Sequence, residues 1–226
     1  MASTSTSTTV AATSTVVVCT LQFSDVPPGS TFYENVRCLA CRGIISGYSD
    51  GTFRPNNSIT RGQIAKMVSN AAGFNDDVTG QSFEDVPNTQ TFYVWIERLY
   101  ARGDMGGYPC GSPGEPCGVG NRPYFRPMQN ASRGQLSKIV ANAADLTTVP
   151  DGQTYTDVPT SNPFYVWIEQ LTDLGVMGGY ACGGPGEPCD PQNRPYFRPF
   201  ADVTRGQASK IVANTFYPGC TIPSGR

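Results

Sequence analysis

Three arginines recur in one four-residue pattern, Ser/Thr-Arg-Gly-Gln, and are the clearest candidates for binding chemistry in this chain. The tetrads are Thr60-Arg61-Gly62-Gln63, Ser132-Arg133-Gly134-Gln135 and Thr204-Arg205-Gly206-Gln207. Each matches a capping box, in which the hydroxyl accepts a hydrogen bond from the third helical amide and the glutamine side chain reaches back to the cap amide. The pattern therefore predicts three helix starts, each with a guanidinium in its first turn.

A guanidinium at a helix start lies against the positive end of the helix dipole, so we expect a compensating anion beside it. That anion is either a carboxylate of the protein or a ligand. Asp25, Asp85 and Asp157 are the internal candidates. Free helix amides beside a guanidinium would form a seat for a carboxylate ligand. Physical chemistry leaves internal pairing and ligand binding equally open at this stage.

Catalytic chemistry finds little support. Histidine is absent, which excludes a Ser/His/Asp triad, and no phosphate loop or metal-ligand cluster is apparent. Glycoside hydrolysis would need carboxylates from different repeats to converge, whereas the acids occupy turns and helix starts. We expect no enzyme activity, no metal site and no cofactor. Glu115 and Glu187 are expected to be solvated turn residues rather than calcium ligands.

The eight cysteines indicate disulfides formed in an oxidising compartment. Two local pairs are expected, Cys110 with Cys117 and Cys182 with Cys189, each closing a loop rich in proline and glycine. Cys38 and Cys41 lie one turn apart on a predicted helix. We expect them to pair with Cys19 and Cys220, in an order that the sequence leaves open.

The tetrads belong to a longer unit that occurs three times. Each unit opens with aromatic-x-Asp-Val-Pro and continues through a helix, a Gly-Tyr turn and a Phe-Arg-Pro segment to the tetrad. The second and third units carry 12 extra residues after the Gly-Tyr turn, which form the cysteine-closed loops. We divide the chain into a Ser/Thr-rich arm (1–20), repeat 1 (21–76), repeat 2 (77–148), repeat 3 (149–217) and a tail (218–226).

Each repeat is predicted to fold as helix, loop, helix. Apolar residues at helical spacing precede Gly43, Gly103 and Gly175, which stand in the position of C-caps. The apolar faces are Val36, Leu39 and Ala40 in repeat 1, Phe92, Trp95, Ile96 and Leu99 in repeat 2, and Phe164, Trp167, Ile168 and Leu171 in repeat 3. The phase of the tryptophans favours burial over a role as sugar-stacking platforms. Single repeats bury too little surface to stand alone, so we expect a shared core.

Composition argues against several partners. The formal net charge is −2 over 226 residues, which offers no basic surface for nucleic acid. No apolar stretch approaches the ~20 residues of a membrane span, so we expect neither nucleic-acid binding nor membrane insertion. The start lacks the features of a signal peptide, and we expect a mature form or a fragment. The arm, which extends to about Cys19 and includes Val16–Val18, has a composition that favours disorder over O-glycosylation or pairing with another subunit.

The repeat resembles the S-layer homology domain. The likeness rests on aromatic-x-Asp-Val, a helix ending in glycine, Gly-Tyr-x-Asp-Gly-Thr-Phe-x-Pro at 47–55 and Ile-Thr-Arg at 59–61, and it covers about residues 21–217. It implies a mainly α fold, in which three helix-loop-helix repeats form a pseudo-threefold prism. The first helices would make a central three-helix bundle, with short extended pieces and with ligand grooves between neighbouring repeats.

The resemblance also implies a function. Such domains anchor S-layer proteins and exoenzymes noncovalently to the bacterial cell envelope, commonly through pyruvylated cell-wall polysaccharide. We therefore expect a noncatalytic, extracellular anchoring module at the cell surface. Its carbohydrate-binding residues would be Arg61, Arg133, Arg205, Thr60, Ser132, Thr204, Gln63, Gln135 and Gln207.

An alternative is a self-assembling subunit of a surface layer or extracellular filament, with the arm contacting other copies. Two departures from the family matter for either function. The family tetrad usually reads Thr-Arg-Ala-Glu, so Gly-Gln removes a negative charge from each predicted groove. The cysteine-closed loops are unusual and would either block the grooves or add to them.

Overall fold

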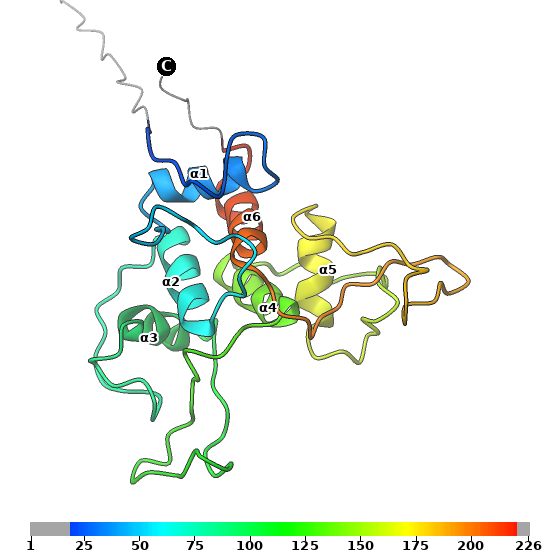
Figure 1. Cartoon of the computed structure of the whole chain (residues 1–226). Coiled ribbons are helices and arrows are strands. Elements are labelled where there is room, and N and C mark those ends of the chain that lie inside the picture. Colours follow the sequence, from blue (N-terminus) through cyan, green and yellow to red (C-terminus); the bar gives the residue numbers. More distant parts are fainter. Residues whose placement is uncertain (1–18, 221–226) are drawn as a thin grey trace, which may run out of the picture.

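Six α-helices and no strand occur in residues 19–220, the part of the chain described by the computed structural model (Figure 1). The helices are α1 (Tyr33–Cys41), α2 (Arg61–Ala71), α3 (Tyr93–Ala101), α4 (Arg133–Ala143), α5 (Tyr165–Asp173) and α6 (Arg205–Phe216). The predicted mainly α fold is confirmed. The expected extended pieces are isolated antiparallel bridges, such as the one between Tyr108 and Tyr124 at the base of the loop of repeat 2.

The tetrads begin the second helix of each repeat, as predicted. In each capping box the Ser or Thr hydroxyl accepts from the glutamine amide at 3.2–3.3 Å, and the glutamine Oε1 accepts from the cap amide at 3.1 Å. Such a cap stabilises a helix by about 1 kcal/mol. The first helices end before left-handed glycines. At Gly43 (φ 70°) the amide of Ile44 returns to the carbonyl of Leu39 at 3.0 Å and closes the helix end.

The helices pair between repeats. Helix α2 of repeat 1 packs on α3 of repeat 2, α4 of repeat 2 on α5 of repeat 3, and α6 of repeat 3 on α1 of repeat 1. Helices α2, α4 and α6 also contact one another at the centre, with α1, α3 and α5 around them (Figure 1). The central bundle therefore exists, but the expectation that the first helices make it is wrong.

Burial differs clearly between the two helices of the α2–α3 pair. Helix α2 buries eight of its 11 residues, including the small Ala65 and Ser69, whereas α3 buries three of nine. In α3, Ile96 and Leu99 are fully buried, but Val94 is 38 % exposed. Because small side chains allow close approach on several sides, α2 suits the centre, and α3 with its single apolar face suits the outside.

A ring of three backbone hydrogen bonds joins the repeats just before their tetrads. The amide of Ile59 donates to the carbonyl of Val203, that of Val203 to Ala131, and that of Ala131 to Ile59, each at 3.0 Å. All three side chains are fully buried. Each repeat thus donates to one neighbour and accepts from the other, which closes a pseudo-threefold arrangement.

All eight cysteines form disulfides within the described residues. The bonds are Cys110–Cys117 and Cys182–Cys189, as predicted, together with Cys19–Cys41 and Cys38–Cys220. The structure thus decides the pairing that the sequence left open. The last two bonds tie both ends of the described chain to α1, beside which these ends lie (Figure 1). The predictions made for the arm before residue 19 fall outside the described residues.

Candidate functional site

Three equivalent grooves lie beside the Gly-Tyr turns of the three repeats. Their cavity volumes are about 160 Å³ for groove I, 180 Å³ for groove II and 290 Å³ for groove III. Groove I contains Tyr48, Gln63, Lys66, Phe92 and Arg205; groove II contains Tyr108, Gln135, Lys138, Phe164 and Arg61; groove III contains Tyr180, Gln207, Lys210, Phe32 and Arg133. The same five side-chain types therefore form each groove.

Every groove combines residues from all three repeats. In groove II, Tyr108, Gln135 and Lys138 belong to repeat 2, while Arg61 comes from repeat 1 and Phe164 from repeat 3. Grooves I and III follow the same rule in cyclic order. A single repeat therefore supplies only part of each groove.

The tetrad arginines reach into the next repeat and donate to main-chain carbonyls. Arg61 Nε donates to the carbonyl of Phe125 at 2.8 Å, and Nη2 donates to that of Gly106 at 2.7 Å. Arg133 binds Phe197 and Gly178 at 2.8 and 2.7 Å, and Arg205 binds Phe53 and Ser46 at 2.9 and 3.2 Å. The three arginines are only 5–7 % exposed. Burial lowers the pKa of each guanidinium, although arginine stays charged in proteins.

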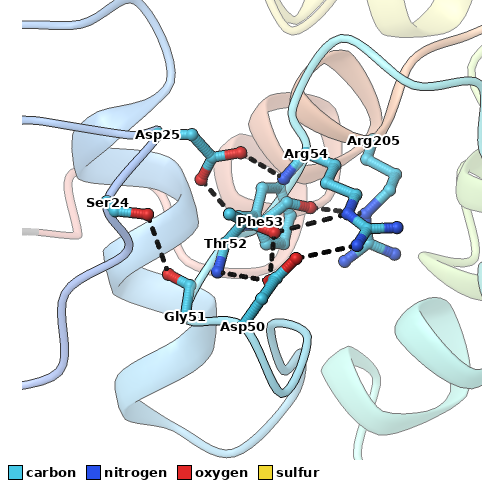
Figure 2. A network of polar contacts seen from close by, with 8 residues as sticks. All are labelled: Ser24, Asp25, Asp50, Gly51, Thr52, Phe53, Arg54 and Arg205. Carbon is cyan, nitrogen blue, oxygen red and sulfur yellow. Dashed lines mark hydrogen bonds and ion pairs between the residues drawn. The ribbon is translucent and has the colours of Figure 1, made fainter.

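The aspartates at the repeat openings hold the backbone. Asp25 accepts hydrogen bonds from the amides of Phe53 and Arg54, both at 2.7 Å (Figure 2). Asp85 and Asp157 bind the equivalent amides at 2.6–2.7 Å. These bonds fix a turn in which the backbone of Arg54 has a left-handed conformation, with φ 59°. This conformation is uncommon for residues other than glycine. The hypothesis that these aspartates pair with the tetrad arginines is therefore wrong, because carbonyls take that place.

The first amides of the second helices are occupied as well. Arg61 N donates to the carbonyl of Gln129 and Gly62 N to that of Pro127, both at 2.9 Å, and the hydroxyl of the cap takes the next amide. Helices α4 and α6 repeat the pattern. The prediction that free helix amides would bind a carboxylate ligand is therefore wrong, because these amides already donate to carbonyl and hydroxyl oxygens of the protein. Of the predicted site residues, each groove contains one tetrad glutamine and the tetrad arginine of another repeat. The hydroxyl residues Thr60, Ser132 and Thr204 do not line the grooves and instead cap the helices.

Each groove tyrosine has two guanidiniums within cation–π distance of its ring. In groove II the Arg126 guanidinium carbon is 3.9 Å from the ring centroid of Tyr108, and that of Arg61 is 5.1 Å away. The hydroxyl of Tyr108 accepts a hydrogen bond from Gln135 Nε2 at 2.8 Å. Tyr48 and Tyr180 have the same pair of arginine neighbours. Cation–π contacts therefore fix the ring that forms the wall of the groove.

Three lysines complete the grooves, and the sequence interpretation missed them. Lys66, Lys138 and Lys210 are the only lysines of the chain, and each lies in a groove, three residues after the tetrad glutamine. No ion pair involves a lysine among residues 19–220. Their equivalent positions in the three repeats were a signal that could have found them.

The tryptophans support two of these lysines. Lys66 Nζ lies 4.7 Å from the ring centroid of Trp95, and Lys138 Nζ lies 4.6 Å from that of Trp167. Both rings pack against the core but are only partly buried, so the expected burial is confirmed in part. Repeat 1 has Asn35 at this position, and groove III therefore lacks the aromatic support.

The tetrad glycine makes room for the groove phenylalanine. A Cβ on Gly62 would lie 2.4 Å from the ring of Phe92, and the same distance separates Gly134 from Phe164 and Gly206 from Phe32. An alanine at the tetrad would therefore push back the aromatic wall of the groove. This contact gives a steric reason for the glycine that replaces the usual family alanine.

Glu115 and Glu187 are ion-paired residues, not solvated ones. Glu115 binds Arg126 through both carboxylate oxygens at 2.6 and 2.7 Å, and Glu187 binds Arg198 identically. These arginine hydrogen bonds lower the pKa of both glutamates. The interpretation of these residues as solvated turns is wrong, because the loop folds back onto the Phe-Arg-Pro turn.

Comparison with known proteins finds one family model and several surface proteins that match this chain. The family model of the S-layer homology domain matches residues 22–65. The chain is 29 % identical to Cell surface glycoprotein 1 of Acetivibrio thermocellus over 63 % of its own length and 6 % of that protein. It is 24 % identical to S-layer protein EA1 of Bacillus anthracis over 85 % of this chain and 20 % of that protein. It is also 24 % identical to the Cellulosome-anchoring protein of A. thermocellus, over 77 % of this chain and 36 % of that protein.

The chain therefore carries the S-layer homology domain and resembles surface proteins over most of its length. It spans only 6 to 36 % of the length of these three relatives. Domains of this type are noncatalytic modules typical of the cell-wall anchoring of surface proteins. None of the helices between residues 19 and 220 has the length and apolar character that crossing a bilayer requires.

Proposed function

We propose that this chain is a noncatalytic module that anchors to the bacterial cell surface by binding an anionic, pyruvylated cell-wall polysaccharide in its grooves. The observation that carries the proposal is that every lysine of the chain lies in one of three equivalent grooves without a carboxylate partner among the described residues. Three lysines that form no ion pair within residues 19–220, in a chain of net negative charge, favour an anionic ligand.

The groove residues would have separate roles. The ammonium of Lys138 is the accessible cation for a pyruvyl carboxylate in groove II. Arg61 contributes charge from the floor, while its carbonyl partners fix its position. The amide of Gln135 and the hydroxyl of Tyr108 offer hydrogen bonds to sugar hydroxyls, and the ring of Phe164 offers an apolar face. A charged sugar needs this combination of charge, hydrogen bonds and apolar contact.

Calorimetric titration of the oxidised protein with pyruvylated and depyruvylated polymer tests the proposal. The variant to compare is Lys66→Gln, Lys138→Gln and Lys210→Gln combined. We expect saturable binding that weakens at least about tenfold on removal of pyruvate or of the lysines. A triple variant with Arg42, Arg122 and Arg194 changed to Gln loses the same charge outside the grooves and should bind normally. Equal weakening in both variants, or no binding by folded wild-type protein, would contradict the proposal.

A second candidate is a subunit that assembles into a surface layer, as the names of the relatives that are S-layer proteins suggest. In that case other copies of the chain would be its partners, with the arm contributing contacts. Electron microscopy and sedimentation of the purified chain decide this point. Sheets or filaments would support assembly, and a persistent monomer would exclude it for this segment.

A further inference from the structure

The inserted loops of repeats 2 and 3 perform a task that a short turn performs in repeat 1. In groove I, Asp50 binds Arg54 at 2.9 Å, and the guanidinium carbon of Arg54 lies 3.9 Å from the ring centroid of Tyr48. Figure 2 shows the contact between Asp50 and Arg54. Asp50 also accepts from the amide and hydroxyl of Thr52, which fixes the turn.

Repeat 2 has no aspartate at the position of Asp50, and a glutamate from the inserted loop takes its role. Glu115 binds Arg126 through both oxygens, at 2.6 and 2.7 Å, and Arg126 lies 3.9 Å from the ring of Tyr108. Repeat 3 matches it, with Glu187, Arg198 and Tyr180 and a stacking distance of 4.0 Å. A carboxylate, an arginine and a groove tyrosine thus form the same chain of contacts in all three repeats.

The loop disulfide fixes the glutamate. Cys110 and Cys117 enclose Glu115, whose carbonyl accepts from the amide of Gly111 at 2.8 Å. The hydroxyl of Tyr124 donates to the carbonyl of Pro116 at 3.0 Å and ties the loop to the strand-like segment below it. A loop so rich in glycine and proline has few apolar side chains to hold it, so the covalent link restricts it instead.

We propose that Glu115 and Glu187 are positioning residues for the groove tyrosines. Ligand binding in grooves II and III therefore depends on the loop disulfides, whereas ligand binding in groove I does not. The proposal rests on the function proposed above. It assigns the inserted loops an indirect role: they set Tyr108 and Tyr180 through an arginine and do not themselves contact the glycan.

The test compares single-groove binding in three variants. A background that keeps only groove II active carries Lys66→Gln and Lys210→Gln. On it, Glu115→Gln and, separately, Cys110→Ser with Cys117→Ser should each weaken binding of the pyruvylated polymer about tenfold. The matched control is the double cysteine variant in a background that keeps only groove I, through Lys138→Gln and Lys210→Gln, and its affinity should be unchanged.

A loop graft separates positioning from direct contact. Residues 109–124 are replaced by Ser-Asp-Gly-Thr, the sequence that repeat 1 has between Tyr48 and Phe53. The graft is made in the background that keeps only groove II active. If the loop acts only through the arginine, the grafted protein binds with the affinity of that background, because the grafted Asp takes the role of Glu115. A grafted protein that folds but binds as weakly as Glu115→Gln would overturn the proposal.

A readout without ligand keeps this proposal distinct from the proposed function. In nuclear magnetic resonance spectra of protein with labelled tyrosine rings, Glu115→Gln should shift the ring signals of Tyr108 and leave those of Tyr48 in place. Unchanged Tyr108 signals would overturn the positioning role, whether or not the polymer binds. If Glu115→Gln shifts the Tyr108 signals but the wild-type protein binds no polymer, the positioning role is supported and the glycan function is rejected.

Discussion

Arg61 Nε donates a hydrogen bond to the carbonyl of Phe125 at 2.8 Å, across the boundary between repeats 1 and 2. The same side chain binds the carbonyl of Gly106 at 2.7 Å and lines groove II. One guanidinium therefore connects two repeats and contributes to a groove at the same time. This double role means that loss of the arginine changes both stability and binding, so the lysines are the cleaner probes of the ligand.

Substitution of Arg61 by alanine should destabilise the protein by about 3 kcal/mol, because two buried carbonyls lose a charged donor. Urea unfolding monitored by circular dichroism measures the change. Arg122→Ala is the control. The side chain of Arg122 is 37 % exposed and pairs with Glu84, so loss of this ion pair should cost less than about 1 kcal/mol. Equal effects of the two substitutions would contradict the assigned role of Arg61.

Substitution of Gly62 by alanine should cost about 2 kcal/mol through overpacking, since the new Cβ would lie 2.4 Å from the ring of Phe92. Gly152→Ala is the matched control, because its Cβ would meet nothing within 4 Å. Thermal unfolding of both variants measures the difference. A Gly62→Ala protein as stable as the wild type would show that the ring of Phe92 yields without cost.

The ion pairs of Glu115 and Glu187 should make stability depend on pH. Their folded-state pKa is lowered by Arg126 and Arg198, so their contribution is present above the ordinary glutamate pKa of about 4.3 and is lost as the pH falls through the lowered folded value. The difference in free energy of unfolding between wild type and a Glu115→Gln, Glu187→Gln variant should therefore shrink on acidification. The carboxylate of Asp50, whose pKa is lowered to about 2 by its hydrogen bonds to Thr52 and Arg54, should keep its contact with Arg54 until the pH falls to about that value.

The disulfide between Cys38 and Cys220 should stabilise the fold more than either loop disulfide. It closes a sequence separation of 182 residues, against seven for Cys110–Cys117. Chain entropy predicts about 5 kcal/mol for the long link and about 2.5 kcal/mol for the short one. Calorimetric unfolding of the two double-serine variants compares them. A larger loss from the short loop would show that native contacts, not chain entropy, dominate its contribution.

Local patterns predicted the local structure well. The Thr60 to Gln63 spacing predicted a capping box and a helix start, because both partners lie within four residues of each other. The Cys-x6-Cys spacing predicted Cys110–Cys117 for the same reason. The sequence did not predict the partners of Arg61 and Glu115, since Phe125 and Arg126 come from a turn whose position depends on packing between segments far apart in the sequence.

The sequence by itself determined that three similar helix-loop-helix units occur, where their second helices begin and which cysteines close the loops, because these features depend on residues close together in the chain. Only the tertiary structure decided that the second helices form the centre, that Cys38 pairs with Cys220, and that each groove draws on all three repeats. These outcomes depend on which buried faces fit together in three dimensions. The three lysines show the difference: their periodic spacing was present in the sequence, but the grooves that give the spacing meaning exist only after the repeats close into a ring.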